Sequence, residues 1–366
     1  MGVIGCMLLL LLSLADSSEV LSHLVSKDEM NWVKYTDSFL THKSTFYTIL
    51  LEIVEEAQLS LEFYEVVCSW FKPLLMPDPP SSKVIKFYFS SEHTLVVQND
   101  RDFTDDFNLV LPGGVPMQGS KGNYTVRIVN KACMQAADIV VDYSISNVYN
   151  LLISPFTPPE FNDKMLYVPS LPFDGYNVFH KEKDHIERSK LIVTSFQFPG
   201  FGERRIAVVE RLEAEYHLKA EAIHFKAMEE EKKVLDDSKI HLNIHQSLEY
   251  CNLQELRIMP TLMRGVIVVS ESVPLEEIYP YHKYIIFANY SDLPRTIDHV
   301  VRNYDSIREK FFGPKSELWA ILDGMRAEAK VQLKRLLLLQ LEDVTRRQKV
   351  REAMNRRLLK QRKHIK

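Results

Sequence analysis

A strand-helix-strand pattern in residues 239–271 constrains the fold of this chain more than any other feature. Apolar residues alternate with His241 and Asn243 over residues 240–244, which is the period of a β-strand. Apolar residues then recur at helical spacing over residues 253–263. Gly265 stands where a helix would end in a left-handed residue, and residues 266–269 form a β-branched run typical of a strand buried on both faces. The pattern therefore predicts a parallel β-α-β crossover.

Polar residues follow both strands of this crossover. They are residues 243–246 after the first strand, and Ser270 and Glu271 after the second. Because open α/β sheets bind ligands in the crevice beyond the carboxyl ends of their strands, we expect a ligand site here. His245, Ser270 and Glu271 are candidate site residues for this reason.

Similar units lie on both sides of the crossover. Strands are expected at residues 191–195, 218–223 and 284–288, and helices at 204–214, 227–235 and 293–311. Upstream, the spacing predicts helices within 32–75, strands at 84–89, 94–97, 109–111, 139–141 and 164–168, and a helix over 126–136. The sequence thus predicts an α/β protein with an acceptor-side domain at 16–185, which has a helical start and is short of strands, and a doubly wound domain at 186–312.

The N-terminus has the features of a targeting segment. Residues 3–12 are apolar and are followed by Ser13-Leu14-Ala15, the small-x-small pattern of a signal cleavage site. We expect residues 1–15 to be a signal peptide or a short anchor. Asn123 and Asn289 begin glycosylation sequons, which fits a protein of the secretory pathway; a cytoplasmic chain is the alternative.

Residues 313–366 are helical in propensity and end in an excess of basic residues. These are Arg346, Arg347, Lys349, Arg351, Arg356, Arg357, Lys360, Arg362, Lys363 and Lys366. A basic helix of this kind can contact an anionic membrane, or it can be a solvated terminal helix. The formal net charge of −4 gives the whole chain no general attraction for nucleic acid, so no specific nucleic-acid partner is expected.

Several familiar sites are excluded by their motifs. The four cysteines, at positions 6, 68, 133 and 251, are too scattered for a C-x-x-C metal or redox site, and we expect them to be small buried apolar residues. The chain also has no H-E-x-x-H, no G-x-S-x-G, no Walker P-loop and no G-x-G-x-x-G after a strand. No metal site is predicted.

The best anion-binding candidate is the turn at residues 198–205. It joins a strand to a helix and combines two glycines, free N–H groups at a helix start, and the guanidinium groups of Arg204 and Arg205, which suits a diphosphate. Plain surface charge is the alternative. Glu255, in the first turn of the later helix, can cap that helix or accept hydrogen bonds from ribose hydroxyls, and Arg257 and His245 can meet phosphate or sugar groups nearby.

Ordered motifs in the chain resemble a known family. The run LNIH at 242–245, E-x-R-I at 255–258 and GVIVVSE at 265–271 look like the C-terminal domain of GT-B glycosyltransferases of the group-1 branch that includes spore-maturation-type proteins. Upstream, Asp142-Tyr143-Ser144 with Asn147, then Tyr167-Val168-Pro169, then Arg204-Arg205 follow in the family's order. The resemblance covers about residues 136–305.

The resemblance implies a function. Arg204 and Arg205 would lie near the diphosphate of a nucleotide-sugar donor, Glu255 would contact the ribose or sugar, and residues 265–271 would wall the pocket. The activity would be transfer of a hexose to an unknown glycan, protein or lipid acceptor, without a metal ion or cofactor, since guanidinium groups and helix starts can stabilise the leaving diphosphate. Ser247 stands where the family has its first paired carboxylate, and no catalytic base is identified. A catalytically inactive binding or scaffold protein is therefore the alternative.

Overall fold

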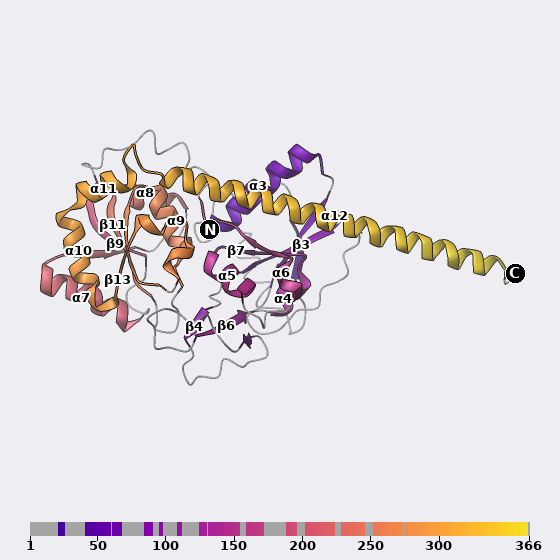
Figure 1. Cartoon of the computed structure of the whole chain (residues 1–366), viewed down its shortest axis with the longest axis horizontal. Helices are drawn as coiled ribbons and strands as arrows, with labels where there is room; N and C mark the ends of the chain where they lie inside the picture. Colours follow the sequence, from indigo (N-terminus) through magenta and orange to yellow (C-terminus); the bar gives the residue numbers. More distant parts are fainter. Residues whose placement is uncertain are drawn as a thin grey trace, which may run out of the picture.

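A computed structural model shows an α/β chain of two lobes, each built on a five-stranded sheet (Figure 1). The structure describes residues 21–25, 41–59, 61–67, 84–90, 95–97, 108–111, 124–129, 131–153, 159–171, 188–195, 202–223, 228–245, 252–273 and 275–364. The first sheet uses strands between residues 21 and 167, and the second uses strands between residues 190 and 288. The expected α/β class with two lobes is confirmed.

The sheet of the first lobe winds in one direction. Its order is β1-β2-β3-β7-β8, with bounds Leu21–Leu24, Glu62–Val67, Val84–Ser90, Ile139–Asp142 and Met165–Tyr167. Strand β1 is antiparallel to β2, and the remaining neighbours are parallel. Among these strands the parallel order never reverses, so this sheet lacks the switch point at which doubly wound sheets bind ligands. The sequence predicts a first domain that is short of strands for a full doubly wound sheet, and a sheet that winds in one direction agrees with that expectation.

A smaller antiparallel sheet corrects one expected helix. Strands β4 (Leu95–Val97), β6 (Tyr124–Val129) and β5 (Asn108–Leu111) pair in that order. The helix predicted over residues 126–136 is wrong in its first half, because helix α4 spans only Lys131–Ala136. The residues of β6, YTVRIV, are mostly β-branched or aromatic, and pairing on both edges favours the strand.

The helical start of the first lobe is also shorter than expected. Helix α3 spans Thr41–Ala57 and ends at Gln58, which has a positive φ of 49°. The predicted helix face extended to Leu61 and Tyr64, but these residues lie in and beside strand β2. The segment EFYEVV pairs with both β1 and β3, so tertiary pairing decides its conformation.

Alternation along the strands gives the first lobe two apolar faces. Ile85 and Phe87 of β3 pack with α3, whereas Tyr88 faces the opposite layer with α4. Helices α5 (Ile145–Ile153) and α6 (Pro159–Asn162) complete that opposite layer through Leu151 and Phe161. The first lobe is therefore a three-layer α/β/α unit.

The second lobe is doubly wound. Its all-parallel order is β10-β9-β11-β12-β13, with bounds Ala220–Ala222, Lys190–Thr194, Ser238–Asn243, Ile267–Glu271 and Ile285–Ala288. Chain order reverses between β9 and β11, which makes their carboxyl ends the switch point. The predicted β-α-β crossover is confirmed as β11, α9 (Glu255–Met263) and β12, and Gly265 has the expected positive φ of 64°.

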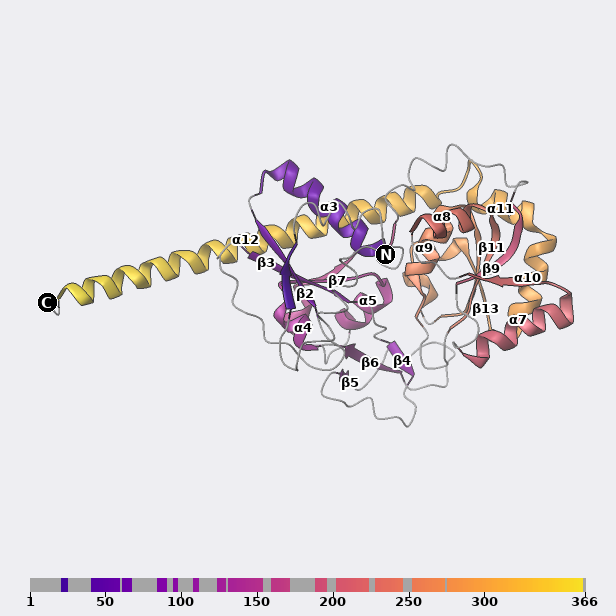
Figure 2. The ribbon, with the colours of Figure 1, turned by 180° about the vertical axis from the view of Figure 1, so that it is seen from behind.

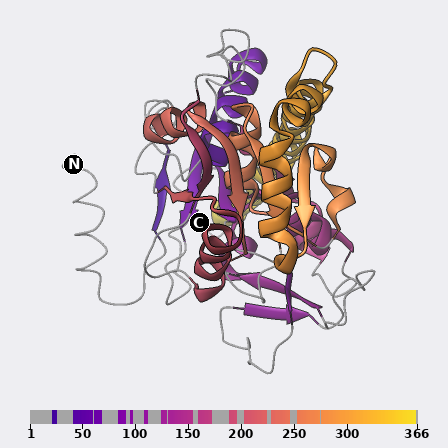
Figure 3. The same cartoon turned by 90° about the vertical axis from the view of Figure 1, so that its left-hand side faces the viewer.

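Helices cover both faces of this sheet (Figure 3). Helices α7 (Glu203–Tyr216) and α10 (Leu293–Arg302) pack on one face, while α9 packs on the other. Helix α8 (Met228–Asp236) precedes β11. The single helix predicted over 293–311 is two helices, because the chain leaves helical geometry at Asn303 before α11 (Tyr304–Phe312).

Helix α12 (Leu318–His364) crosses from the second lobe to the first and then projects beyond it (Figures 1 and 2). Leu318 and Leu322 are buried against α9, and Leu333 and Leu337 are buried against α3. Arg326 and Lys330 pair with Glu52 of α3. The first half of the predicted basic tail is thus part of both cores, and the basic run lies in the second half.

Some sequence expectations lie outside the described residues or need correction. Several predicted features lie outside the described ranges: the proposed leader at 1–15, Asn123, Gln246, Ser247 and the first half of the turn at 198–205, residues 198–201. Cys133 is buried but disulfide-bonded, so the expectation of free apolar cysteines is wrong for this residue. Within the described part of the chain, no helix is long and apolar enough to cross a bilayer.

Candidate functional site

The switch point of the second lobe brings four of the predicted site residues together. Arg204 and Arg205 belong to the first turn of α7, which follows β9. His245 follows β11, and Glu271 ends β12. They meet because the parallel strands end at the same edge of the sheet and α7 starts there.

Arg204 and Glu271 form the central ion pair. The two guanidinium nitrogens of Arg204 donate to Oε1 and Oε2 of Glu271 at 2.5 and 2.9 Å, and Nη1 also donates to the carbonyl of His245 at 3.2 Å. The guanidinium carbon lies 4.1 Å from the ring centre of Tyr290, whose hydroxyl donates to the Arg204 carbonyl. Burial alone would raise the pKa of Glu271, but the bonds from Arg204 outweigh it and lower that pKa.

Arg205 is the buried arginine of the cluster. Its side chain is 2% exposed, and Nε donates to the carbonyl of Ile244 at 3.0 Å. Burial, followed by the positive charges of Arg257 and Arg204, lowers the pKa of Arg205 to about 10. Arg205 is therefore still charged at pH 7, but it lies among like charges, and a bound anion would relieve their repulsion.

His245 is a neutral, buried polar group beside the ion pair. Its backbone N–H donates to Glu271 Oε2 at 3.1 Å, and Nδ1 lies 3.6 Å from the same oxygen. Burial lowers the pKa of His245 to about 4, so the ring is uncharged at pH 7. Nε2 is buried without a hydrogen-bond partner among the described residues. Such an atom can accept or donate one hydrogen bond to a ligand or a water molecule.

Arg257 and Ser270 support the cluster from its edge. Arg257 donates to the side chain of Gln254 and lies near enough for its charge to affect Arg205. Ser270 is fully buried; its hydroxyl accepts from Asn243 at 3.0 Å and donates to the carbonyl of Glu271 at 2.9 Å. Ser270 thus holds the end of β12 and does not face a ligand.

Glu255 is not part of this cluster. It begins α9 as expected, but its side chain is fully buried and turned toward the first lobe. Oε1 accepts from the Ile145 N–H at 2.6 Å, and Oε2 accepts from the hydroxyls of Tyr167 and Tyr281, each at 2.8 Å. Burial raises the pKa of Glu255 to about 8. The structure therefore gives this carboxylate three protein partners and no open face.

Polar residues of the first lobe meet the second lobe beside Glu255. Asp142, which begins the first upstream motif of the family resemblance, is fully buried and accepts from the Ser144 N–H at 2.8 Å and from the Asn147 amide at 3.1 and 3.2 Å. Burial raises the pKa of Asp142 to about 7. Asn147 in turn accepts from the amide of Asn252 in the second lobe at 2.7 Å. These residues build the junction between the lobes.

Sequence reasoning missed three tyrosines of the site and the junction. Tyr290 stacks on Arg204 and follows β13, so the rule that site residues follow strands would have found it. Tyr167 entered only as part of a family motif, and Tyr281 lies in an irregular segment with no sequence signal. Their hydroxyls became visible as partners of Glu255 only in the folded chain.

The cluster has the charge of an anion site. Arg204, Arg205 and Arg257 contribute three positive charges, Glu271 contributes one negative charge, and neutral His245 contributes none, which leaves +2 at pH 7. The start of α7, where the Arg205 N–H donates to the N-cap carbonyl of Gly202 at 3.0 Å, adds the positive end of the helix dipole to the same potential. This arrangement can hold a doubly charged anion such as a diphosphate.

Two other features lie apart from the cluster. A cavity of about 620 Å³ lies between α5, β8 and α12, with Leu152, Tyr167, Gly324 and Met325 among its lining residues. Within the described ranges, no three His, Cys, Asp or Glu side chains are grouped so that they could hold a metal ion.

Comparison with known proteins found no matching family model and no matching curated protein. Among solved structures, the pneumococcal O-GlcNAc transferase GtfA in complex with UDP and GlcNAc is similar with a TM-score of 0.41 and 8% identity, over 71% of this chain and 53% of that chain. AviGT4, a glycosyltransferase involved in avilamycin A biosynthesis, has a TM-score of 0.32 and 13% identity, over 57% of this chain and 78% of that chain. Arabidopsis thaliana UGT89C1 complexed with UDP-L-rhamnose has a TM-score of 0.28 and 10% identity, over 67% and 65%. This chain thus spans only about half of the first of these proteins, and its two-lobed fold follows from the strand order and register described above.

Proposed function

We propose that this protein binds a nucleotide sugar at the switch point of its second lobe and transfers the sugar to an acceptor. The observation that supports the proposal is the +2 cluster of Arg204, Arg205 and Arg257 around Glu271 at the carboxyl ends of β9, β11 and β12. The ordered motifs that resemble group-1 glycosyltransferases point to the same ligand. The placement in the spore-maturation-type branch is part of this proposal.

The donor diphosphate would lie against the start of α7. Arg204 is partly accessible, since its side chain is 17% exposed, and Arg257 is also partly exposed, whereas Arg205 supplies its charge from a buried position. As the bond between sugar and diphosphate breaks, negative charge grows on the leaving group, and fixed guanidinium groups stabilise it without moving. His245 Nε2, buried and without a partner among the described residues, is placed to bond a phosphate oxygen or a sugar hydroxyl.

A second candidate function is a binding protein without transferase activity. The specific observation in its favour is Glu255, which the family resemblance assigns to the donor but which here is bonded to Ile145, Tyr167 and Tyr281. Ser247, in place of the expected first carboxylate, supports the same alternative. In that case the cluster binds a nucleotide but the protein catalyses no transfer.

Calorimetry with UDP, GDP, their sugars, uridine and pyrophosphate tests the proposal. We expect binding of at least one nucleoside diphosphate, binding of pyrophosphate, and none of uridine, because the cluster recognises the diphosphate. Arg204→Gln should weaken binding by about 1.5–3 kcal/mol through loss of a charged hydrogen bond. The control is Arg302→Gln, since Arg302 is 73% exposed and pairs with Asp298 on its own helix.

No binding of any diphosphate by the folded protein would exclude the proposed site. Binding with equal affinity in Arg204→Gln and Arg302→Gln would show that the anion lies elsewhere. If the nucleotide sugar binds but is neither hydrolysed nor transferred to glycan, protein or lipid acceptors, the inactive binding protein is the better description.

The setting of the activity is proposed to be the secretory pathway. Two observations support it: Cys133 is disulfide-bonded, and disulfides persist in oxidising compartments; and the sequon residue Asn289 is exposed. Expression in secretory cells should give a product that begins at Asp16 and loses mass on endoglycosidase treatment. A full-length chain of unmodified mass in the cytosol would contradict this.

A further inference from the structure

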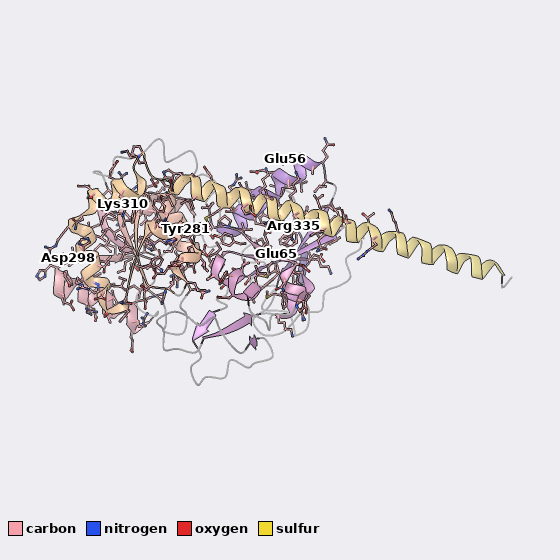
Figure 4. All side chains as sticks on the ribbon, in the orientation of Figure 1. Glu56, Glu65, Tyr281, Asp298, Lys310 and Arg335 are labelled. Carbon is pink, nitrogen blue, oxygen red and sulfur yellow. The ribbon has the colours of Figure 1, made fainter. Side chains whose placement is uncertain are left out.

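The junction between the lobes is built around one carboxylate. Glu255, in the first turn of α9, is fully buried and accepts three hydrogen bonds. Two of the donors, the Ile145 N–H and the Tyr167 hydroxyl, belong to the first lobe, and the third, Tyr281, belongs to the second. Figure 4 shows Tyr281 between the lobes. The carboxylate therefore links α5 and β8 of one lobe to α9 of the other.

Glu255 itself is closed to water, whereas its first-lobe partners Ile145 and Tyr167 are partly buried and line the cavity of about 620 Å³. Ile145, Tyr167 and Leu171 of the first lobe pack in one apolar cluster with Met259 and Tyr281 of the second. Such packing strengthens a hydrogen bond and makes its loss costly, because a buried group without a partner cannot turn to water. A second buried bond, from Asn252 to Asn147 at 2.7 Å, runs across the junction beside the first.

The link shares a helix turn with the charged cluster. Arg257, two residues after Glu255, acts on Arg205 through its charge. The end of α9 that is tied to the first lobe is thus the end that contributes to the anion site. Because α9 packs on the sheet of the second lobe, Arg257 stays with Arg205 if the first lobe moves.

We infer that Glu255 is a positioning residue that locks the two lobes together, and that it is not itself a ligand group. Three of the four lone-pair sites of its carboxyl group accept hydrogen bonds inside the protein, and with a pKa of about 8 the group also carries a proton at pH 7. A ribose could reach the Glu255 carboxyl group only if its hydrogen bonds to the first lobe were broken. The exclusion of Glu255 as a ligand group rests on the proposed function, whereas the lock between the lobes does not.

A matched pair of tyrosine variants isolates the interlobe bond. Tyr167→Phe and Tyr281→Phe each remove one hydroxyl that donates to the same oxygen at the same 2.8 Å, but only the Tyr167 bond crosses between lobes. Two measurements, both made without ligand, report on the contact between the lobes. One is hydrogen exchange of the Ile145 amide, and the other is the distance distribution between spin labels on unnatural amino acids at exposed positions Asp163 and Lys310.

We expect Tyr167→Phe to speed exchange at Ile145 at least fivefold and to broaden the interlobe distances, while Tyr281→Phe changes neither. Glu255→Gln keeps the shape but turns one accepting oxygen into an NH2 donor, so it should fall between the wild type and Glu255→Ala. Glu255→Ala should speed exchange at Ile145 more than Tyr167→Phe does.

Two results would overturn the inference. One is equal exchange and equal distances in the two tyrosine variants. The other is a Glu255→Ala protein that keeps wild-type distances and exchange but no longer binds UDP, which would make the carboxylate a ligand group. If Glu255→Ala does not fold, the tyrosine pair still decides. Because distances and exchange are measured without nucleotide, they stand even if no nucleotide binds.

Discussion

Removal of the negative charge of Glu271 tests most directly the net charge of +2 that we assign to the cluster. Glu271 is the acceptor for both guanidinium nitrogens of Arg204 and for the N–H of His245, and its side chain is 10% exposed. Glu271→Gln keeps the shape but leaves three guanidinium groups without a counter-charge. The net charge of the cluster rises from +2 to +3 in a site largely closed to solvent.

The expected loss of stability follows from this burial. Breaking a buried ion pair by removing one partner costs about 3–5 kcal/mol, and the retained amide oxygen reduces this to about 3 kcal/mol. The matched control is Glu215→Gln on α7, since Glu215 pairs with Arg211 at 2.9 Å but is 44% exposed. An exposed pair of this kind contributes about 0.5 kcal/mol or less.

Chemical unfolding at pH 7, with and without pyrophosphate, measures the effect. The pKa of Glu271 is lowered in the folded protein, so its stabilisation is complete above its unfolded pKa and is lost as the pH falls through the folded value. We expect pyrophosphate to restore part of the lost stability of the variant. It should stabilise the variant more than the wild type, because the anion replaces the missing negative charge. A variant as stable as Glu215→Gln, or one that pyrophosphate does not restore, would refute the charge balance assigned to the cluster.

Three further predictions concern α12 and the junction. Gly324→Ala should stabilise the protein by about 0.5–1 kcal/mol, because a Cβ there meets no atom within 4 Å and alanine favours the helix; a lower thermal midpoint would contradict this. Truncation after residue 341 removes ten basic and three acidic residues, a net +7, and should abolish binding to anionic vesicles while leaving the thermal midpoint unchanged; vesicle binding equal to that of the full chain would exclude the basic end as the membrane contact. The pKa of Glu255 is raised by burial to about 8, so its stabilisation is complete below about pH 4.5 and is lost toward pH 8. Glu255→Gln should therefore lose less stability than the wild type across that window in pH-dependent unfolding, and identical profiles would show that Glu255 does not titrate there.

Local patterns predicted the second lobe well. Periods of two and of three to four residues come from the backbone geometry of strands and helices, so β11, α9 and β12 were found from the alternation and spacing of apolar residues alone. The rule that polar residues after parallel strands face a crevice placed His245 and Glu271 correctly at one edge. The same patterns failed at Tyr124–Val129 and Glu62–Val67, where strand pairing with distant segments decides the conformation.

The sequence by itself determined the α/β class and the position of Arg204 and Arg205 at the carboxyl ends of the strands, because each depends on neighbours within one β-α unit. Only the tertiary structure decided what Glu255 does. Its partners Ile145 and Tyr167 lie 110 and 88 residues away, and the period of a helix cannot say which distant donors its first turn will meet. The sequence around a glutamate at the start of a helix does not show whether its carboxyl group binds a ribose or another lobe. Here its burial and its three hydrogen-bond donors assign Glu255 to the contact between the lobes.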